Sequence, residues 1–157
     1  MYTLYYAPGA ASLVVHWLLI ETGAPHELVR LDLAAKEQKS AEYLKLNPAG
    51  VVPTLIVDGA PVIECAALTL LLAERHPEAA LEPARGTRER ATYLQWTMTL
   101  ANTLQPAFRL WWYPAEGAGE GHHPRNQAAW MFADVRAHRR EERGHRREGD
   151  EVMVGEA

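Results

Sequence analysis

The sequence predicts an α/β domain over residues 1–76, a linker over residues 77–86, and an incomplete all-α domain over residues 87–157. Two observations predict this division. The first half alternates short β-prone runs with apolar helical stretches and separates them with turn residues. After residue 87 the apolar residues follow helical spacing, without a strand pattern. A chain of 157 residues can hold one good core, or two small ones that share an interface.

Seven elements are expected in the α/β domain, in the order strand, helix, strand, helix, strand, strand, helix. They cover Tyr2–Tyr6, Ser12–Thr22, Glu27–Leu31, Ser40–Leu46, Thr54–Val57, Pro61–Glu64 and Cys65–Arg75. Apolar residues recur at helical spacing in the first helix (Leu13, Trp17, Ile20) and in the last (Leu68, Leu71, Leu72), which predicts one apolar face on each. Asp58-Gly59 is typical of a hairpin turn. This order of elements predicts a thioredoxin-like fold.

The stretch Asn47–Leu55 contains two prolines, a glycine and then an apolar run. Because proline cannot donate to a strand ladder, Pro53 is expected at the first position of its strand or on an edge. The Val52-Pro53 bond is a candidate for the cis form, which few other bonds in a protein adopt. Backbone groups turned outward there would pair with an extended, peptide-like ligand as an added strand does.

In the second domain a long helix is expected from Thr87, and Pro106 should kink it. Its apolar positions are Ala91, Leu94, Met98 and Ala101. Residues 127–138 form a possible further helix. Residues 136–148 are rich in Arg and Glu and cannot supply an apolar face to a bundle.

Bulk composition excludes several classes of protein. The net charge of -4 argues against a dedicated nucleic-acid binder, and the single cysteine excludes an intramolecular disulfide. His122-His123 has no further ligands at metal spacing, so no metal site is predicted. No apolar run is long enough to span a membrane, and Met1 leads straight into a strand without a signal peptide. We therefore expect a cytoplasmic protein without membrane or nucleic-acid partners.

Three short motifs at a particular spacing, Pro8-Gly9-x-x-Ser12, Val52-Pro53 and Glu64-Cys65, resemble the bacterial glutathione transferase family. The resemblance covers about residues 1–135 and is greatest to the beta class, although Ala11 stands where that class has a cysteine. It implies that glutathione is the co-substrate, that its thiolate attacks a small hydrophobic electrophile, and that the protein forms a homodimer. No metal is implied. Disulfide chemistry through the missing cysteine is excluded.

The resemblance also implies which residues act on the glutathione sulfur. A thiol with a pKa of about 8.5 is mostly protonated at neutral pH. A hydroxyl and a helix N-terminus aimed at the sulfur would favour the thiolate. Ser12 is the first candidate, and Tyr5 and Tyr6 are the other hydroxyls within reach. The alternative for Ser12 is a plain helix cap.

The remaining candidates bind the tripeptide. Val52 would offer its backbone, presented by cis-Pro53, to the cysteinyl part. Glu64 would bind the α-amino group and the N–H of Cys65 the carboxylate of the γ-glutamyl end. Cys65 has a simpler interpretation as a small buried hydrophobe. Lys36 matches a basic residue near the glycyl carboxylate, and a solvated loop lysine is an equal alternative.

From the second domain, Asn102, Gln105 and Arg109 share one stripe of the long helix, which in this family overhangs the pocket. A solvent-exposed face is the simpler explanation of such a stripe. Trp111, Trp112 and Tyr113 are candidates to line the electrophile site, or to pack in the core or a dimer interface. Two other functions stay open. The chain could be a non-catalytic glutathione-binding or interaction protein, or a redox thiol protein that acts through Cys65.

Overall fold

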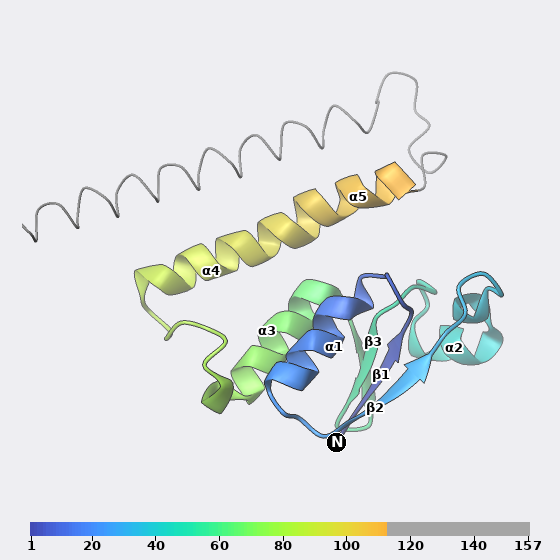
Figure 1. Ribbon diagram of the computed structural model, residues 1–157, viewed down its shortest axis with the longest axis horizontal. Coiled ribbons are helices and arrows are strands. Elements are labelled where there is room, and N and C mark those ends of the chain that lie inside the picture. Colours follow the sequence, from blue (N-terminus) through green and yellow to red (C-terminus); the bar gives the residue numbers. More distant parts are fainter. Residues whose placement is uncertain (113–157) are drawn as a thin grey trace, which may run out of the picture. The chain divides into compact units, whose positions relative to one another are not determined.

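The computed structural model describes residues 1–112 (Figure 1). It divides into two units, Met1–Met98 and Thr99–Ala157. The division falls near the end of a helix and leaves the predicted domain boundaries at residues 76 and 87 as predictions. None of the helices within residues 1–112 is long and apolar enough to cross a membrane.

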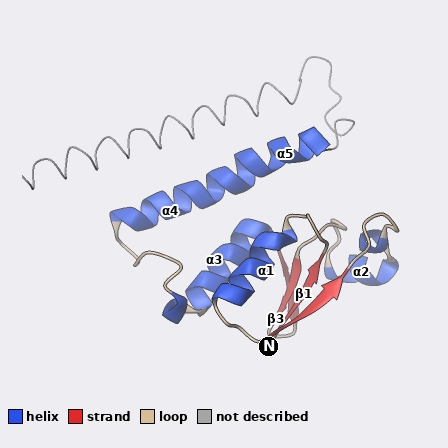
Figure 2. Cartoon of the chain, in the orientation of Figure 1, coloured by secondary structure: helices blue, strands red, loops and turns tan. Residues whose placement is uncertain are grey.

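A four-stranded mixed sheet forms the centre of the first unit, with the strand order β2-β1-β3-β4 (Figure 2). β1 (Tyr2–Tyr6) pairs in parallel with β2 (His26–Arg30) and antiparallel with β3 (Thr54–Val57). β3 continues through a tight turn into its antiparallel neighbour β4 (Ala60–Ile63). Every strand expected from the sequence is present, and the thioredoxin-like fold is confirmed.

Helices cover both faces of this sheet. α1 (Ser12–Glu21) and α3 (Cys65–Arg75) lie together on one face, and α2 (Ala41–Leu46) lies on the other side, after the 3₁₀ turn η1 (Glu37–Lys39). Apolar side chains from the sheet, α1 and α3 are fully buried and form the core, which stabilises the unit by removing apolar surface from water. The fully buried members are Leu4, Leu55, Val15, Leu19, Leu68 and Leu72.

The apolar face predicted for α1 is not the face that packs in the core. Leu13, Trp17 and Ile20 are 63%, 62% and 58% exposed, whereas Val15 and Leu19 are fully buried. Seven of the ten residues of this helix are apolar, so apolar residues at helical spacing occur on more than one of its faces, and periodicity alone does not select the buried face. In α3 the prediction is confirmed, because Leu68 and Leu72 are buried and Leu71 packs against the core.

Polar contacts join the C-terminal end of α3 to the sheet. Arg75 Nη2 lies 2.5 Å from Asp58 Oδ2 in the turn between β3 and β4. Tyr2 Oη, at the start of β1, shares a hydrogen bond of 3.1 Å with His76 Nε2. These two contacts hold the C-terminal end of α3 to the β3–β4 turn and to the start of β1.

Beyond η2 (Pro77–Ala79), α4 (Arg88–Thr99) begins the long helical stretch expected from the sequence. A π-helical turn at Leu100–Leu104 precedes α5 (Gln105–Trp112). Pro106 lacks an amide hydrogen, so the carbonyl of Asn102 cannot have its usual helical partner. The π-helical turn ends two residues before Pro106, and the kink expected at Pro106 stays a prediction. Tyr113, the possible helix at 127–138 and the Arg-rich run lie outside the described residues.

Candidate functional site

The turn between β1 and α1 is held together by Ser12. Its hydroxyl is fully buried, accepts a hydrogen bond from the N–H of Ala7 and donates one to the carbonyl of Ala7, both at 3.2 Å. Ala11 is the N-cap of α1, and no side chain makes a capping bond there. Ser12 is therefore not a helix cap. Its hydroxyl stabilises the preceding turn through the backbone of Ala7. A donation to a ligand sulfur would require its proton to leave the Ala7 carbonyl.

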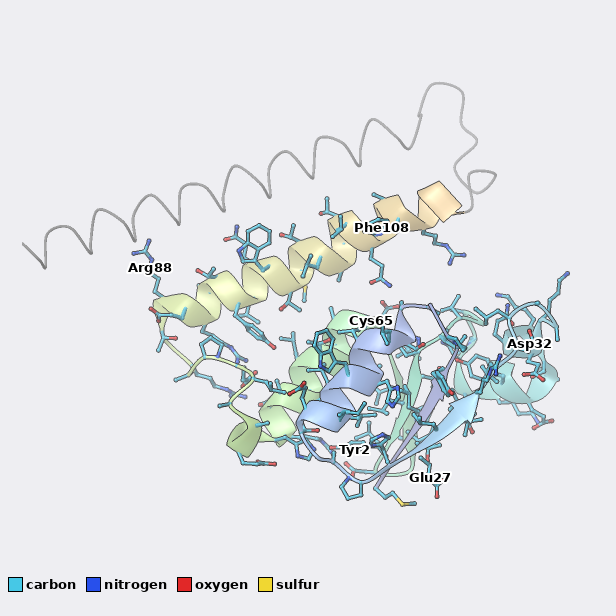
Figure 3. All side chains as sticks on the ribbon, viewed as in Figure 1. Tyr2, Glu27, Asp32, Cys65, Arg88 and Phe108 are labelled. Atoms are coloured by element: carbon cyan, nitrogen blue, oxygen red, sulfur yellow. The ribbon has the colours of Figure 1, made fainter. Side chains whose placement is uncertain are left out.

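The N-termini of α1 and α3 lie next to each other. Cys65, the first residue of α3 (labelled in Figure 3), has its Sγ 3.4 Å from the carbonyl oxygen of Ala11 and donates a weak hydrogen bond to it. Neither helix has an acidic residue in its first turn or a side-chain cap. The N-cap of α3 is the exposed Glu64, whose side chain makes no capping bond. The first-turn N–H groups of both helices are therefore not capped by a side chain, and such groups bind a carboxylate or a thiolate.

Glu64 directly precedes α3 in a strained conformation. Its φ and ψ angles are 75° and 113°, a region that residues with a Cβ atom seldom adopt, and its side chain is exposed. Such strain persists where the surroundings impose it and is common at ligand-binding positions. The conformation places an exposed carboxylate beside the start of α3.

The Val52-Pro53 peptide bond is cis, as expected. Pro53 is buried and stands one residue before β3, which pairs on both sides with β1 and β4. The missing N–H thus falls just outside the ladder of a central strand, and not on an edge.

Three buried side chains that the sequence prediction missed hold this loop: Tyr43, Asn47 and Thr54. Tyr43 Oη and Asn47 Nδ2 both donate to the carbonyl of Val51, at 2.7 and 2.8 Å. Burial raises the pKa of Tyr43 above its usual range, against the opposing effect of its hydrogen bonds to Thr54 and Asn47. The signal in the sequence was Asn47-Pro48 at the end of a short helix, which the prediction used only as a helix stop.

The two tyrosines at the end of β1 lie on different sides. The ring of Tyr5 is 5.6 Å from that of Tyr43, on the side of the Val52-Pro53 loop. The ring of Tyr6 is 6.1 Å from that of His16, on the side of α1. Of these two candidates, Tyr5 is thus the one connected to the loop.

Lys36 is exposed and has a left-handed conformation, φ 59°, directly before η1. Asp32 Oδ1 fixes this bend by accepting the N–H groups of Ala34 and Ala35. Another lysine, Lys39, reaches the cis-proline loop and donates from Nζ to the carbonyl of Ala49 at 3.0 Å. The glycyl-carboxylate role of Lys36 stays a prediction.

The remaining predicted residues belong to the second unit. Asn102 lies in the π-helical turn, Gln105 begins α5, and both are exposed, as is Arg109. Trp111 and Trp112 end α5. The binding roles of these residues stay predictions. Within residues 1–112 no group of three or more His, Cys, Asp or Glu side chains is placed to hold a metal ion.

Comparison with known proteins gives one consistent family. The family model of the glutathione S-transferase N-terminal domain matches residues 1–73. Glutathione S-transferase GST-4.5 of Xanthomonas campestris is 38% identical over 106 residues, which are 68% of this chain and 51% of that protein. Glutathione S-transferase GstA of Escherichia coli O157:H7 is 34% identical over 67% of this chain and 53% of its own length. The chain thus spans about half the length of these two relatives.

Solved structures agree. A sphingomonad glutathione S-transferase in complex with glutathione superposes with a TM-score of 0.71 at 30% identity, over 85% of this chain and 67% of that one. A ternary complex of BphK, a bacterial glutathione S-transferase, gives a TM-score of 0.70 at 34% identity, over 85% of this chain and 68% of the other. The fold, the three motifs and these relatives lead to the same conclusion: the chain belongs to the glutathione S-transferase family.

Proposed function

We propose that this protein binds glutathione and transfers it, as the thiolate, to a small hydrophobic electrophile. The observation that carries the proposal is the convergence of two helix N-termini that have no side-chain cap, joined through Cys65 and Ala11, in a unit that also holds a cis-proline loop. Helix N-termini favour anions, and a tripeptide with a thiolate and two carboxylates supplies them. Relatives with the same fold were solved with glutathione bound.

In this proposal each candidate residue has one task. The backbone of Val52 pairs with the cysteinyl part of glutathione, Glu64 binds its α-amino group, and the N–H of Cys65 binds its γ-glutamyl carboxylate. The positive end of α1 favours the thiolate, with Ser12 as an additional donor once its hydroxyl turns from Ala7. The thiolate sulfur then donates an electron pair to an electrophilic carbon. A C–S bond forms while the leaving group departs with its own pair, or while the acceptor takes up the pair and is protonated by water.

A second candidate function is glutathione binding without turnover. It is favoured by one observation, the commitment of the buried Ser12 hydroxyl to Ala7. In this case the α1 N-terminus alone would bind the sulfur, with too little stabilisation of the thiolate for conjugation. The homodimer, the electrophile and a cytoplasmic location stay predictions in both cases.

Calorimetric titration of glutathione into the full chain tests the proposal. Saturable binding is expected, and Glu64→Gln should weaken it about ten- to a hundredfold, because a hydrogen bond to a charged group is worth about 1.5–3 kcal/mol. Glu42→Gln is the matched control, since Glu42 is an exposed carboxylate paired with Lys45 on α2. A chromogenic conjugation assay then separates the two functions, because only the enzyme turns over. A folded protein that binds no glutathione would refute both.

A further inference from the structure

The side chains of Tyr43, Asn47 and Thr54, here called the anchor cluster, lie within the protein at the base of the Val52-Pro53 loop. They are 3%, 0% and 0% exposed. Buried polar groups are costly unless each one has a partner, so the hydrogen bonds of this cluster must be complete.

Every side-chain donor of the cluster has an acceptor. The carbonyl of Val51 only accepts, so the single proton of the Tyr43 hydroxyl goes to it, over 2.7 Å. Thr54 Oγ1 must then donate to Tyr43 Oη, over 2.8 Å. Asn47 Nδ2 uses one proton for the carbonyl of Val51 and the other for Thr54 Oγ1. No donor of the three side chains is left over.

The cluster acts on the backbone of the loop. The carbonyl of Val51 accepts two hydrogen bonds from different side chains, which fixes the direction of that peptide group. Asn47 Oδ1 also accepts the N–H of Ala49 at 3.1 Å, and the N–H of Gly50 donates to the carbonyl of Asn47 at 2.9 Å. Val51 itself is 39% exposed, so packing of its side chain does little to hold the turn.

A ligand that pairs with main-chain groups needs those groups in place before it arrives. Otherwise the free energy of ordering the loop is subtracted from the binding free energy. We propose that the anchor cluster positions the Val51–Val52 backbone for glutathione, and so sets the affinity for glutathione by acting through the loop. This inference rests on the proposed function, in which Val52 binds the cysteinyl part. Tyr43, Asn47 and Thr54 are thus positioning residues.

Tyr43→Phe tests the inference, because it removes one donor to Val51 and leaves the ring in place. The dissociation constant of glutathione should rise about three- to tenfold, the range for one lost hydrogen bond. In steady-state kinetics the KM for glutathione should rise by the same factor while kcat at saturation stays unchanged. A merely structural role would reduce the active fraction, and hence the apparent kcat, and would leave KM alone.

Tyr2→Phe is the matched control. It also removes a tyrosine hydroxyl from a hydrogen bond, the one with His76, but at the start of β1. In Figure 3 Cys65 lies at the upper end of α3, and Tyr2 lies toward the lower end of the sheet. This variant should lose thermal stability without a change in glutathione affinity. Thr54→Val is a second variant that keeps both donors to Val51, and it should raise the dissociation constant less than Tyr43→Phe does.

The outcomes separate the two proposals. If the folded wild-type protein binds no glutathione, the proposed function fails and this inference fails with it. If the wild type binds but Tyr43→Phe retains its affinity within twofold, only the inference is overturned. If Tyr43→Phe does not fold, Thr54→Val tests the inference. A raised dissociation constant for Thr54→Val, with unchanged glutathione binding by Tyr2→Phe, supports the positioning role. An unchanged dissociation constant for Thr54→Val rejects it.

Discussion

Replacing Ser12 with alanine should have two effects that can be measured separately. The first is on stability. The hydroxyl is the hydrogen-bond partner of the N–H of Ala7, a residue only 3% exposed, whereas the carbonyl of Ala7 also accepts from Ala10. Ser12→Ala therefore leaves one buried donor unpaired, which costs about 1–3 kcal/mol of the free energy of unfolding. Chemical denaturation measures this loss.

The second effect is on the bound thiol. If the hydroxyl turns to the thiolate in the complex, its loss removes a hydrogen bond to a charged group, worth about 1.5–3 kcal/mol. The pKa of the thiol of bound glutathione should then rise by about one to two units. Ultraviolet absorbance of the thiolate, followed against pH, measures that pKa.

Thr22→Val is the control, because Thr22 donates its hydroxyl proton to the carbonyl of Leu18 at the other end of α1. It should reduce stability and leave the thiol pKa unchanged. If Ser12→Ala shows the wild-type thiol pKa and the wild-type kcat/KM, the thiolate role of Ser12 is refuted. If it keeps wild-type stability, the reasoning from burial is wrong.

Three further predictions concern the backbone and the charges. Glu64→Gly should bind glutathione poorly yet unfold at higher denaturant concentration, since glycine adopts a φ of 75° without strain; equal or lower stability would contradict the strain argument. Gly50→Ala should lower the free energy of unfolding by about 1–3 kcal/mol, because the added Cβ would lie 2.8 Å from the backbone oxygen of Gln38 and the φ of this residue is +60°. Gly23→Ala, with a similar φ and nothing within 4 Å, should cost less. The hydrogen bond from Arg75 lowers the pKa of Asp58 below its usual 3.8, so this pair stabilises the fold above that pH and the contribution is lost as the pH falls through the lowered pKa. Denaturant unfolding at a series of pH values below about pH 5 should accordingly show a smaller acid-dependent loss of stability for Asp58→Asn than for the wild type.

The order of the elements was predictable because each boundary in the first unit has its own local signal. Pro8-Gly9 and Gly23 end elements, and Asp58-Gly59 makes a tight turn by its left-handed conformations, φ 52° and 82°. The cis bond before Pro53 was predictable because proline is the residue that permits it.

The side-chain contacts of the site were not predictable in the same way. The partner of Ser12 is the backbone of Ala7, and any helix-start serine has the same local sequence signal whether it caps the helix or ties the turn. Tyr43 reaches Thr54 across eleven positions of sequence, a contact that no local pattern encodes. The sheet and α3 determine which face of α1 is buried, and the spacing of apolar residues within α1 carries no information about those neighbours.

The water-facing residues of α1 have a practical consequence. Leu13, Trp17 and Ile20 share one exposed side of a helix whose other side carries the buried Val15 and Leu19. An apolar surface of this kind promotes association in concentrated solution. Lysine at positions 13 and 20 would leave the core side chains unchanged, so the solubility of this protein can be engineered on α1 independently of its fold.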